Sequence, residues 1–118
     1  MIVPFGSSLR GQTSTAVGGA QPAGHIDYVS WNIEGLQTKP NITTFSLISS
    51  AAIDLLAGPA LAGTVHEVIR LGMLNNCSTA VTTVIFVDDG VTTRVLSRTS
   101  LTTTQSLNFE RGTGWYVI

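Results

Sequence analysis

Short β-type segments follow one another from residue 42 to the end of the chain, each separated from the next by turn residues. Residues 79–87 are almost all β-branched, which is typical of a strand buried on both faces. Residues 64–74 alternate between apolar and polar side chains, with an exception at Glu67. The apolar set that we expect on one face of this segment is Val65, Ile69, Leu71 and Met73.

Turn-forming residues mark the other boundaries of this pattern. Turns are predicted at Asn75–Ser78, Asp88–Gly90 and Arg111–Gly114, and further strands at residues 43–50, 51–56, 91–100, 107–109 and 115–118. Gly58 and Pro59 limit residues 53–61 to a single helical turn at most. About six or seven short, evenly spaced strands predict an all-β protein, an antiparallel β-sandwich or jelly roll.

Residues 1–40 differ from the rest of the chain, because they hold three of the four prolines and half of the twelve glycines. Such a segment loses too much conformational entropy on ordering to fold alone, so a disordered tail is one interpretation. However, Phe5, Tyr28 and Trp31 make it apolar for a linker. We therefore predict an extended N-terminal arm over residues 1–40 that orders against a neighbouring subunit, and a β-sandwich domain over residues 41–118.

The composition predicts a surface that is poor in charge. Charged residues make up 11% of the chain, against roughly 25% in an average soluble domain. Ser and Thr together contribute 27 residues. A weakly charged surface repels neighbouring molecules weakly, which suits a subunit whose faces become buried.

Several classes of partner are disfavoured by the same sequence. The net charge is −1 and the six basic residues are scattered, so no nucleic-acid footprint is present. No apolar run approaches the roughly 20 residues of a membrane span, and residues 1–19 lack the pattern of a signal peptide. The single cysteine, Cys77, rules out an intrachain disulfide framework and favours synthesis in a reducing cytoplasm.

From about Ser50 to Ile118 the order of strands and turns is distinctive. It consists of the Asn75-Asn76 turn, a Val/Thr strand over 81–87, Gly90, the Leu107–Phe109 segment and a closing Gly114-Trp115. This stretch, a little over half the chain, resembles a small β-sandwich module of tailed-bacteriophage virion proteins. The resemblance includes no catalytic signature. It implies a head-decoration, fibre or tail-tip part, often trimeric.

Large aromatic side chains are the first candidates for contacts between subunits, because they dominate interface energetics when they are buried against a partner. Phe5, Tyr28 and Trp31 belong to a segment without a core of its own, so we predict that they contact other subunits. Trp115 lies in the terminal strand, and we predict that it packs in the core.

Two arginines complete the predicted contact set. Arg94 and Arg98 are expected on one face of the strand over residues 91–100. There they are solvated or pair with a carboxylate of a neighbouring subunit, such as Glu67 or Asp88.

Few residues have the spacing of a catalytic site. Ser49, His66 and Asp54 could be combined into a Ser-His-Asp set, but no G-x-S-x-G motif surrounds any serine. Cys77 has no cationic neighbour in sequence to activate it, so it is expected to fill space. We therefore predict no catalytic residue.

Metal and cofactor sites are equally weakly indicated. His25 and His66 are the only histidines and lack the spacing of a zinc site. Asp88-Asp89-Gly90 is more typical of a hairpin turn than of a calcium loop. Gly18-Gly19 lacks the Lys-Ser/Thr of a phosphate-binding loop. No cofactor and no metal are expected.

These observations predict a non-enzymatic structural subunit of a bacteriophage virion, made in the host cytoplasm. The first hypothesis is a capsid decoration (cement) protein that clamps the particle through its arm, and the alternative is a fibre, collar or tail-tip component. Its partners would be other virion proteins, such as the major capsid protein or tail proteins, and further copies of itself, as a trimer by resemblance. Neither nucleic acid nor membrane is an expected partner. A second class, a carbohydrate-binding adhesin module, would present an exposed aromatic platform near Asp and Asn.

Overall fold

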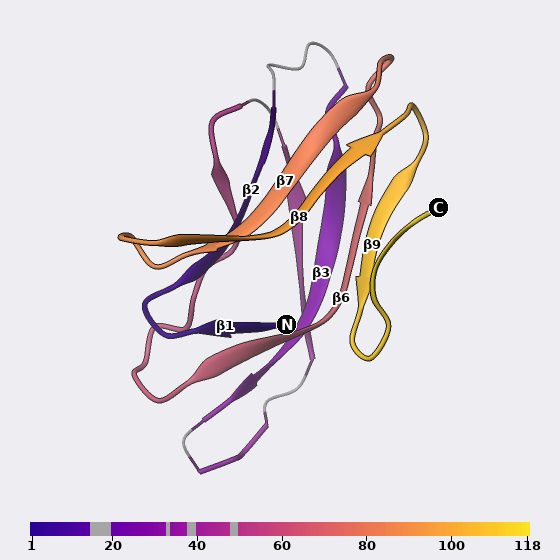
Figure 1. Cartoon of the computed structure of the whole chain (residues 1–118). Coiled ribbons are helices and arrows are strands. Elements are labelled where there is room, and N and C mark those ends of the chain that lie inside the picture. Colours follow the sequence, from indigo (N-terminus) through magenta and orange to yellow (C-terminus); the bar gives the residue numbers. More distant parts are fainter. Residues whose placement is uncertain (15–19, 33, 38–39, 48–49) are drawn as a thin grey trace.

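The structure, a computed structural model, describes residues 1–14, 20–32, 34–37, 40–47 and 50–118. In these residues ten β-strands form two antiparallel sheets that pack against each other, and no helix is present (Figure 1). The predicted all-β sandwich is confirmed. The described part of the chain accordingly contains no helix able to span a membrane. The strands are β1 (Ile2–Pro4), β2 (Ser8–Thr13), β3 (Ala23–Trp31), β4 (Asn41–Ser46), β5 (Ile53–Leu56), β6 (Val65–Leu74), β7 (Val81–Asp88), β8 (Thr93–Leu101), β9 (Ser106–Glu110) and β10 (Gly114–Val117).

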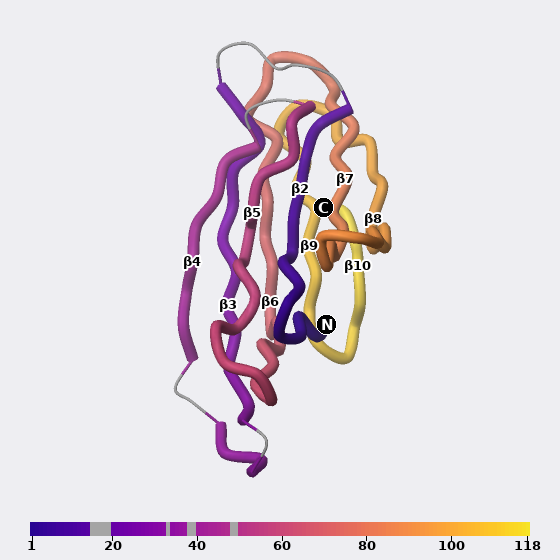
Figure 2. The backbone as a smooth tube through the Cα atoms, turned by 90° about the vertical axis from the view of Figure 1, so that its left-hand side faces the viewer, coloured from indigo at the N-terminus to yellow at the C-terminus, as the bar shows by residue number. Residues whose placement is uncertain are grey.

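The chain passes several times between the two sheets, which we name sheet A and sheet B. Sheet A has six strands in the order β10–β9–β6–β3–β4, with β1 paired to the start of β6. Sheet B has four strands in the order β5–β2–β7–β8. Figure 2 shows β4 and β3 of sheet A on one side of the molecule and β7 and β8 of sheet B on the other. Among the described residues, the edges of the sandwich are therefore formed by β4, β10 and the short β1 in sheet A and by β5 and β8 in sheet B.

Side chains that alternate inward from both sheets form one core. The largest fully buried ones include Leu9 and Ile85 from sheet B and Ile26 and Leu71 from sheet A. Burying each such side chain contributes about 1.5–3 kcal/mol relative to leaving it exposed. Trp115 packs against this core, with its ring 5.2 Å from that of Phe109, as predicted.

Residues 1–40 do not form an extended arm in the described structure, so that prediction is corrected. Strand β2 lies between β5 and β7, and β3 lies between β6 and β4. Val3, Leu9 and Ile26 are fully buried in the common core. The sandwich includes both ends of the chain, and Asn41 begins an edge strand rather than a separate domain.

The strands predicted beyond residue 41 are present as seven strands, β4 to β10. Strand β7 is buried on both faces as predicted, since Thr83 and Ile85 on one face and Val84 and Phe86 on the other are all buried. Gly90 has a φ of 88° at the tip of the β7–β8 hairpin, which is the positive φ that the turn requires.

A bulge in β6 explains why Glu67 departed from the alternation. The register between β3 and β6 shifts so that Ile69 has no residue opposite it, and the side chains before it change face. Val68 is therefore fully buried in the core, and Glu67 instead bonds Arg111 at 2.6 Å. The prediction that Val65 shares the core face with Leu71 and Met73 is wrong for this reason, and Ile69, the bulged residue itself, is half-buried outside the core.

Candidate assembly surface

The structure does not bring the three predicted aromatic contact residues together at one free surface. Phe5 lies in the turn between β1 and β2 and is 51% exposed. Tyr28 and Trp31 are half-buried in β3, where the Tyr28 ring packs edge-on against His66 at 4.9 Å. Phe5 is therefore the one of the three with the most apolar surface left for a partner.

Arg94 and Arg98 do not share a strand face, contrary to the prediction. The register between β7 and β8 shifts near Leu96, so Arg94 lies opposite Val87 and Arg98 opposite Val84. Val87 packs against the core, whereas Val84 lies on the outer face of sheet B, so the two arginines belong to opposite faces. A bulge of this kind inverts the alternation that sequence spacing assumes.

The carboxylates suggested as partners for these arginines already have partners in the same chain. Glu67 pairs with Arg111, and Asp88 lies 3.4 Å from Arg10. Both Arg94 and Arg98 are exposed. They remain predicted contact residues, now on separate faces.

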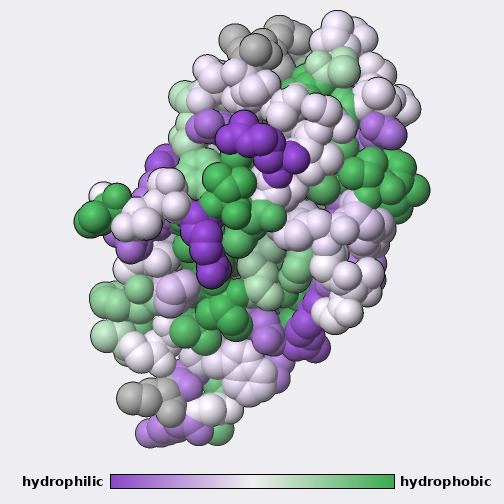
Figure 3. Space-filling model, viewed as in Figure 1, coloured by the Kyte–Doolittle hydropathy of each residue, from purple (hydrophilic) through white to green (hydrophobic). Residues whose placement is uncertain are grey.

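The outer face of sheet B mixes apolar and basic side chains. Val84 and Phe86 are buried on this face, next to Arg98 and Arg10 in the neighbouring strands, and Val95 is half-exposed beside Phe86. Figure 3 views this side of the molecule and shows hydrophobic side chains interrupted by strongly hydrophilic ones. The long arginine stems are suited to cover apolar surface while the charged ends stay in water.

A second apolar region lies where two uncharged loops meet, and we name residues 4–7 and 57–63 the loop end. Gly58 packs so closely on the first loop that an added Cβ would be 1.8 Å from the Ser7 carbonyl oxygen. Figures 1 and 2 both show these loops side by side. Phe5 and Leu61, which is 73% exposed, are the large apolar side chains of this region. Leu61 was not among the predicted contact residues, although residues 55–64 carry no charge, which was a usable signal.

The edge strands differ in how they are protected against pairing with another molecule. Strand β8 carries Arg94 and Arg98 and contains a bulge, and β5 has four residues including Asp54. Strands β4 and β10 contain no charged residue. Charges, bulges and short length are the usual protection of edge strands, so β4, with six residues, is the least protected edge.

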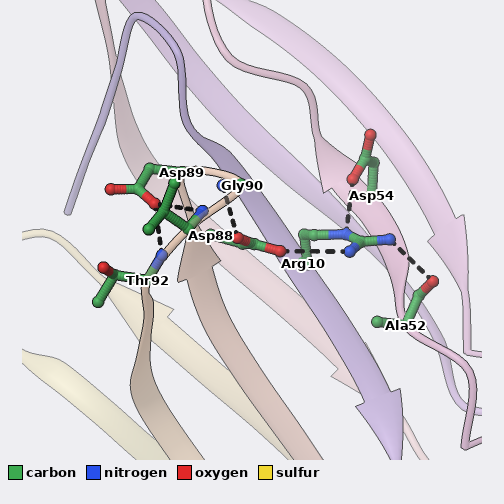
Figure 4. Close-up of polar contacts among 8 residues, drawn as sticks. Arg10, Ala52, Asp54, Asp88, Asp89, Gly90 and Thr92 are labelled. Atoms are coloured by element: carbon green, nitrogen blue, oxygen red, sulfur yellow. Dashed lines mark hydrogen bonds and ion pairs between the residues drawn. The ribbon is translucent and has the colours of Figure 1, made fainter.

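The clearest polar network of the structure surrounds Arg10 on the outer face of sheet B (Figure 4). Its guanidinium lies 2.9 Å from Asp54 and 3.4 Å from Asp88, and it donates a hydrogen bond of 3.1 Å to the carbonyl oxygen of Ala52. The Oδ1 atom of Asp88 in turn accepts a hydrogen bond from the Gly90 amide. Arg10 thus ties β2 to β5 and to the β7–β8 hairpin, and the role of these aspartates is structural.

Asp89 should make the stability of the hairpin depend on pH. Its Oδ1 accepts hydrogen bonds from the amides of Thr92 and Val91, and these bonds lower the pKa of the Asp89 carboxyl. Because the pKa is lowered on folding, the stabilisation is complete above about pH 4, the usual range of an aspartate, and is lost as the pH falls through the folded value. We expect wild type to be more stable than Asp89→Ala at pH 7, with the difference shrinking below pH 4 in urea denaturation. An advantage that stays constant down to pH 2 contradicts this assignment.

The residues that were considered and rejected as catalytic or metal-binding groups in the sequence are not brought together in the described structure. Ser49 and Gly18-Gly19 lie outside the described residues. Asp54 bonds Arg10, whereas His66 Nδ1 lies 2.7 Å from Ser30 Oγ, and burial lowers the pKa of His66. Cys77 is buried, with its thiol directed at the Ala20 carbonyl. No cluster of three or more metal-ligating side chains and no pocket occur in the part of the chain that the structure describes.

One row of four residues, three of them with polar side chains, crosses the outer face of sheet A. The strand register places His25, Gly72, Asn108 and Tyr116 next to one another in that order. Tyr116 donates a hydrogen bond of 2.8 Å from its hydroxyl to Glu110, and this bond is the main cause of the raised pKa of the Tyr116 phenol. The row brings aromatic, imidazole and amide groups onto one face, and it was not anticipated from the sequence because the four residues come from four different strands.

A comparison of the chain with protein-family models, with curated proteins and with solved structures finds no match.

Proposed function

We propose that this chain is a structural subunit of a bacteriophage virion, and specifically a capsid decoration protein that works by assembly rather than by catalysis. The sandwich itself, and not an N-terminal arm, makes the contacts in this proposal. The partners are other virion proteins and further copies of the chain. A fibre, collar or tail-tip position is the alternative within the same class.

The observation that carries the proposal is the combination of weak charge with unprotected apolar surface. Charged residues form 11% of the chain, and β4 and β10 are uncharged free edges. Phe5 and Leu61 add exposed apolar area at the loop end. Such features are a liability in an isolated soluble domain and are suited to a subunit that becomes covered. The resemblance of the segment from about Ser50 to Ile118 to virion modules supports the same role.

Sedimentation of particles from the virus that encodes the chain tests the proposed function. We expect the chain to sediment with DNA-filled heads at a copy number on the order of hundreds, as symmetric decoration requires, and to be lost from heads when Phe5→Ser and Leu61→Ser are combined. Arg111→Ala is the matched surface control, because Arg111 lies outside the loop end and is expected to leave attachment unchanged. About a dozen copies on tails would support the tail alternative. A chain that stays at the top of the gradient contradicts a virion role.

One observation favours the second candidate, a carbohydrate-binding module. Tyr116 lies beside Asn108 on the outer face of sheet A, with Glu110 in hydrogen-bond contact with the tyrosine. An aromatic ring next to amide and carboxylate groups is suited to binding a sugar. A carbohydrate-binding module needs no N-terminal arm, and the described structure shows none, so this feature does not count against the second candidate. Binding to a glycan array that is lost in Tyr116→Ala, without any particle association, would favour this candidate.

A further inference from the structure

Strand β4 is a regular strand at one edge of sheet A. Its six residues pair with β3 without any register shift, from Tyr28 opposite Asn41 to Ala23 opposite Ser46. In the part of the chain that the structure describes, no strand pairs with its other edge over residues 42–46. Figure 2 shows β4 as the outermost strand of sheet A.

The chemistry of β4 is compatible with another uncharged strand. It contains two threonines and two large apolar residues, and no acidic, basic or proline residue lies within it. Ile42 is 72% exposed on the outer face of sheet A, next to Asp27 of β3. An edge of this length without charge, proline or bulge is a template for strand addition.

We propose that β4 pairs antiparallel with β4 of a second copy of this chain, so that sheet A continues through a twofold dimer. The proposal names the subunit contact of the structural role proposed above, and it rests on that role for its use in the particle. A twofold contact brings a strand against itself, so the strand must not carry charge that repels its own copy. Strand β8 would set arginine against arginine, whereas β4 presents no charge to its copy.

The alternation of side chains restricts the register of such a pair. Phe45 points inward and Ile42 outward, so residues directly opposite each other must have the same parity in order to keep the apolar face buried. The two centred registers that satisfy this condition place either Thr43 or Thr44 on the twofold axis. Both give a cross-strand threonine pair, which is a favourable combination on a sheet.

Cysteine substitution tests both the contact and its register, since the native Cys77 is buried and gives a low background. Thr43→Cys, Thr44→Cys, Ile42→Cys and Val95→Cys would be made singly and oxidised mildly. In each register, the residue on the twofold axis lies opposite its own copy, with about 4.5–5.5 Å between the two Cβ atoms. This separation is short enough for a disulfide between the two cysteines. We expect Thr43→Cys or Thr44→Cys to form a covalent dimer in high yield.

The other two variants are the controls. Ile42→Cys is more exposed than either threonine, but in both registers its copy lies at least one diagonal position away, about 7–8 Å or more, and it should remain monomeric. Val95→Cys, half-exposed on the charged edge β8, should also remain monomeric. Cross-linking of Ile42→Cys as strong as that of the threonine variants indicates collision rather than a registered pair and overturns the proposal.

Light scattering of the unmodified chain, coupled to size exclusion, provides the second measurement. We expect a dimer that becomes a monomer in Thr44→Lys and persists in Val95→Lys, with unchanged circular dichroism in both. A wild-type monomer at every concentration overturns the twofold contact, as does a trimer, because threefold symmetry needs two different edges. These measurements use the isolated chain, whereas the sedimentation experiment uses particles. A chain that does not dimerise would overturn the twofold contact but not the proposed virion role, and a chain that is absent from particles would overturn the virion role while the dimer could still be measured.

Discussion

Gly24→Ala should lower the free energy of unfolding by about 3 kcal/mol, at the upper end of the usual cost of overpacking. Gly24 lies near the start of β3, between β4 and β6, where it pairs with Phe45 on one side and Met73 on the other. A Cβ at this position would be 1.9 Å from the Gly72 carbonyl oxygen and 2.8 Å from the Met73 Cα. Both atoms belong to the backbone, so β3 and β6 must separate locally to admit the methyl group.

Gly72→Ala is the matched control because it adds the same methyl group to the partner strand. Its Cβ would meet His25 Cε1 at 3.1 Å and Asn108 Oδ1 at 3.5 Å. These are ends of side chains that can rotate, and the loss of glycine entropy from the unfolded chain offsets part of the cost. We expect a change below about 1 kcal/mol in urea denaturation followed by tryptophan fluorescence. Equal destabilisation by the two substitutions contradicts the close approach of β3 to β6.

The strands of the second half of the chain could be predicted because their core positions are filled by large β-branched or aliphatic residues. Strand β7 is the clearest example, since Val84, Ile85 and Phe86 leave no exposed face to be confused with a loop. Thr83 is fully buried among them, and its hydroxyl donates to the Thr99 carbonyl. Local sequence and tertiary burial agree here, which is the condition under which pattern reasoning works.

The strands in the first third of the chain could not be predicted from the sequence pattern, and the reason is physical. In β2 the inward positions are Leu9, Gly11 and Thr13, of which one alone is a large hydrophobic residue. A Cβ at Gly11 would lie 3.0–3.2 Å from the side chains of three core residues, so the core is closely packed against this small residue. A strand whose buried face is made of small and hydroxyl residues gives almost no hydrophobic period, so a central strand of sheet B was interpreted as part of an arm.

The positions of the candidate contact residues were only partly predictable. Phe5 is exposed, as its place outside the predicted core implied, and its contact with another subunit stays a prediction. Arg94 and Arg98 were placed on one face because a bulge cannot be read from a two-residue period. The edge position of β4 could not be inferred at all, because the sequence shows that this strand is uncharged but only the strand order shows that it is an edge.

Asn75→Ala should cost about 3 kcal/mol of unfolding free energy, although the sequence places this residue in an ordinary turn. Its side chain is fully buried and joins two loops at the end of the sandwich. The Nδ2 group donates to the carbonyl oxygens of Leu101 at 3.0 Å and of Thr79 and Thr102 at 3.2 Å, and Oδ1 accepts from the Cys77 amide. Alanine leaves the most deeply buried of these backbone groups unpaired, at about 1–3 kcal/mol each.

Two further substitutions separate the hydrogen bonds of Asn75 from its volume. The neighbouring Asn76 is exposed, with one long hydrogen bond of 3.4 Å to the Gln21 carbonyl, so Asn76→Ala should change stability by less than about 0.5 kcal/mol. Asn75→Asp keeps the size and the acceptor but sets a carboxylate against three carbonyl oxygens. Burial without a donor raises the pKa of that carboxyl on folding, so the destabilisation should be full at pH 7 and should shrink as the pH falls toward about 4, where protonation restores a donor. A deficit of Asn75→Asp that does not change with pH, measured in urea against Asn76→Ala, would show that the amide donor does not hold these loops together.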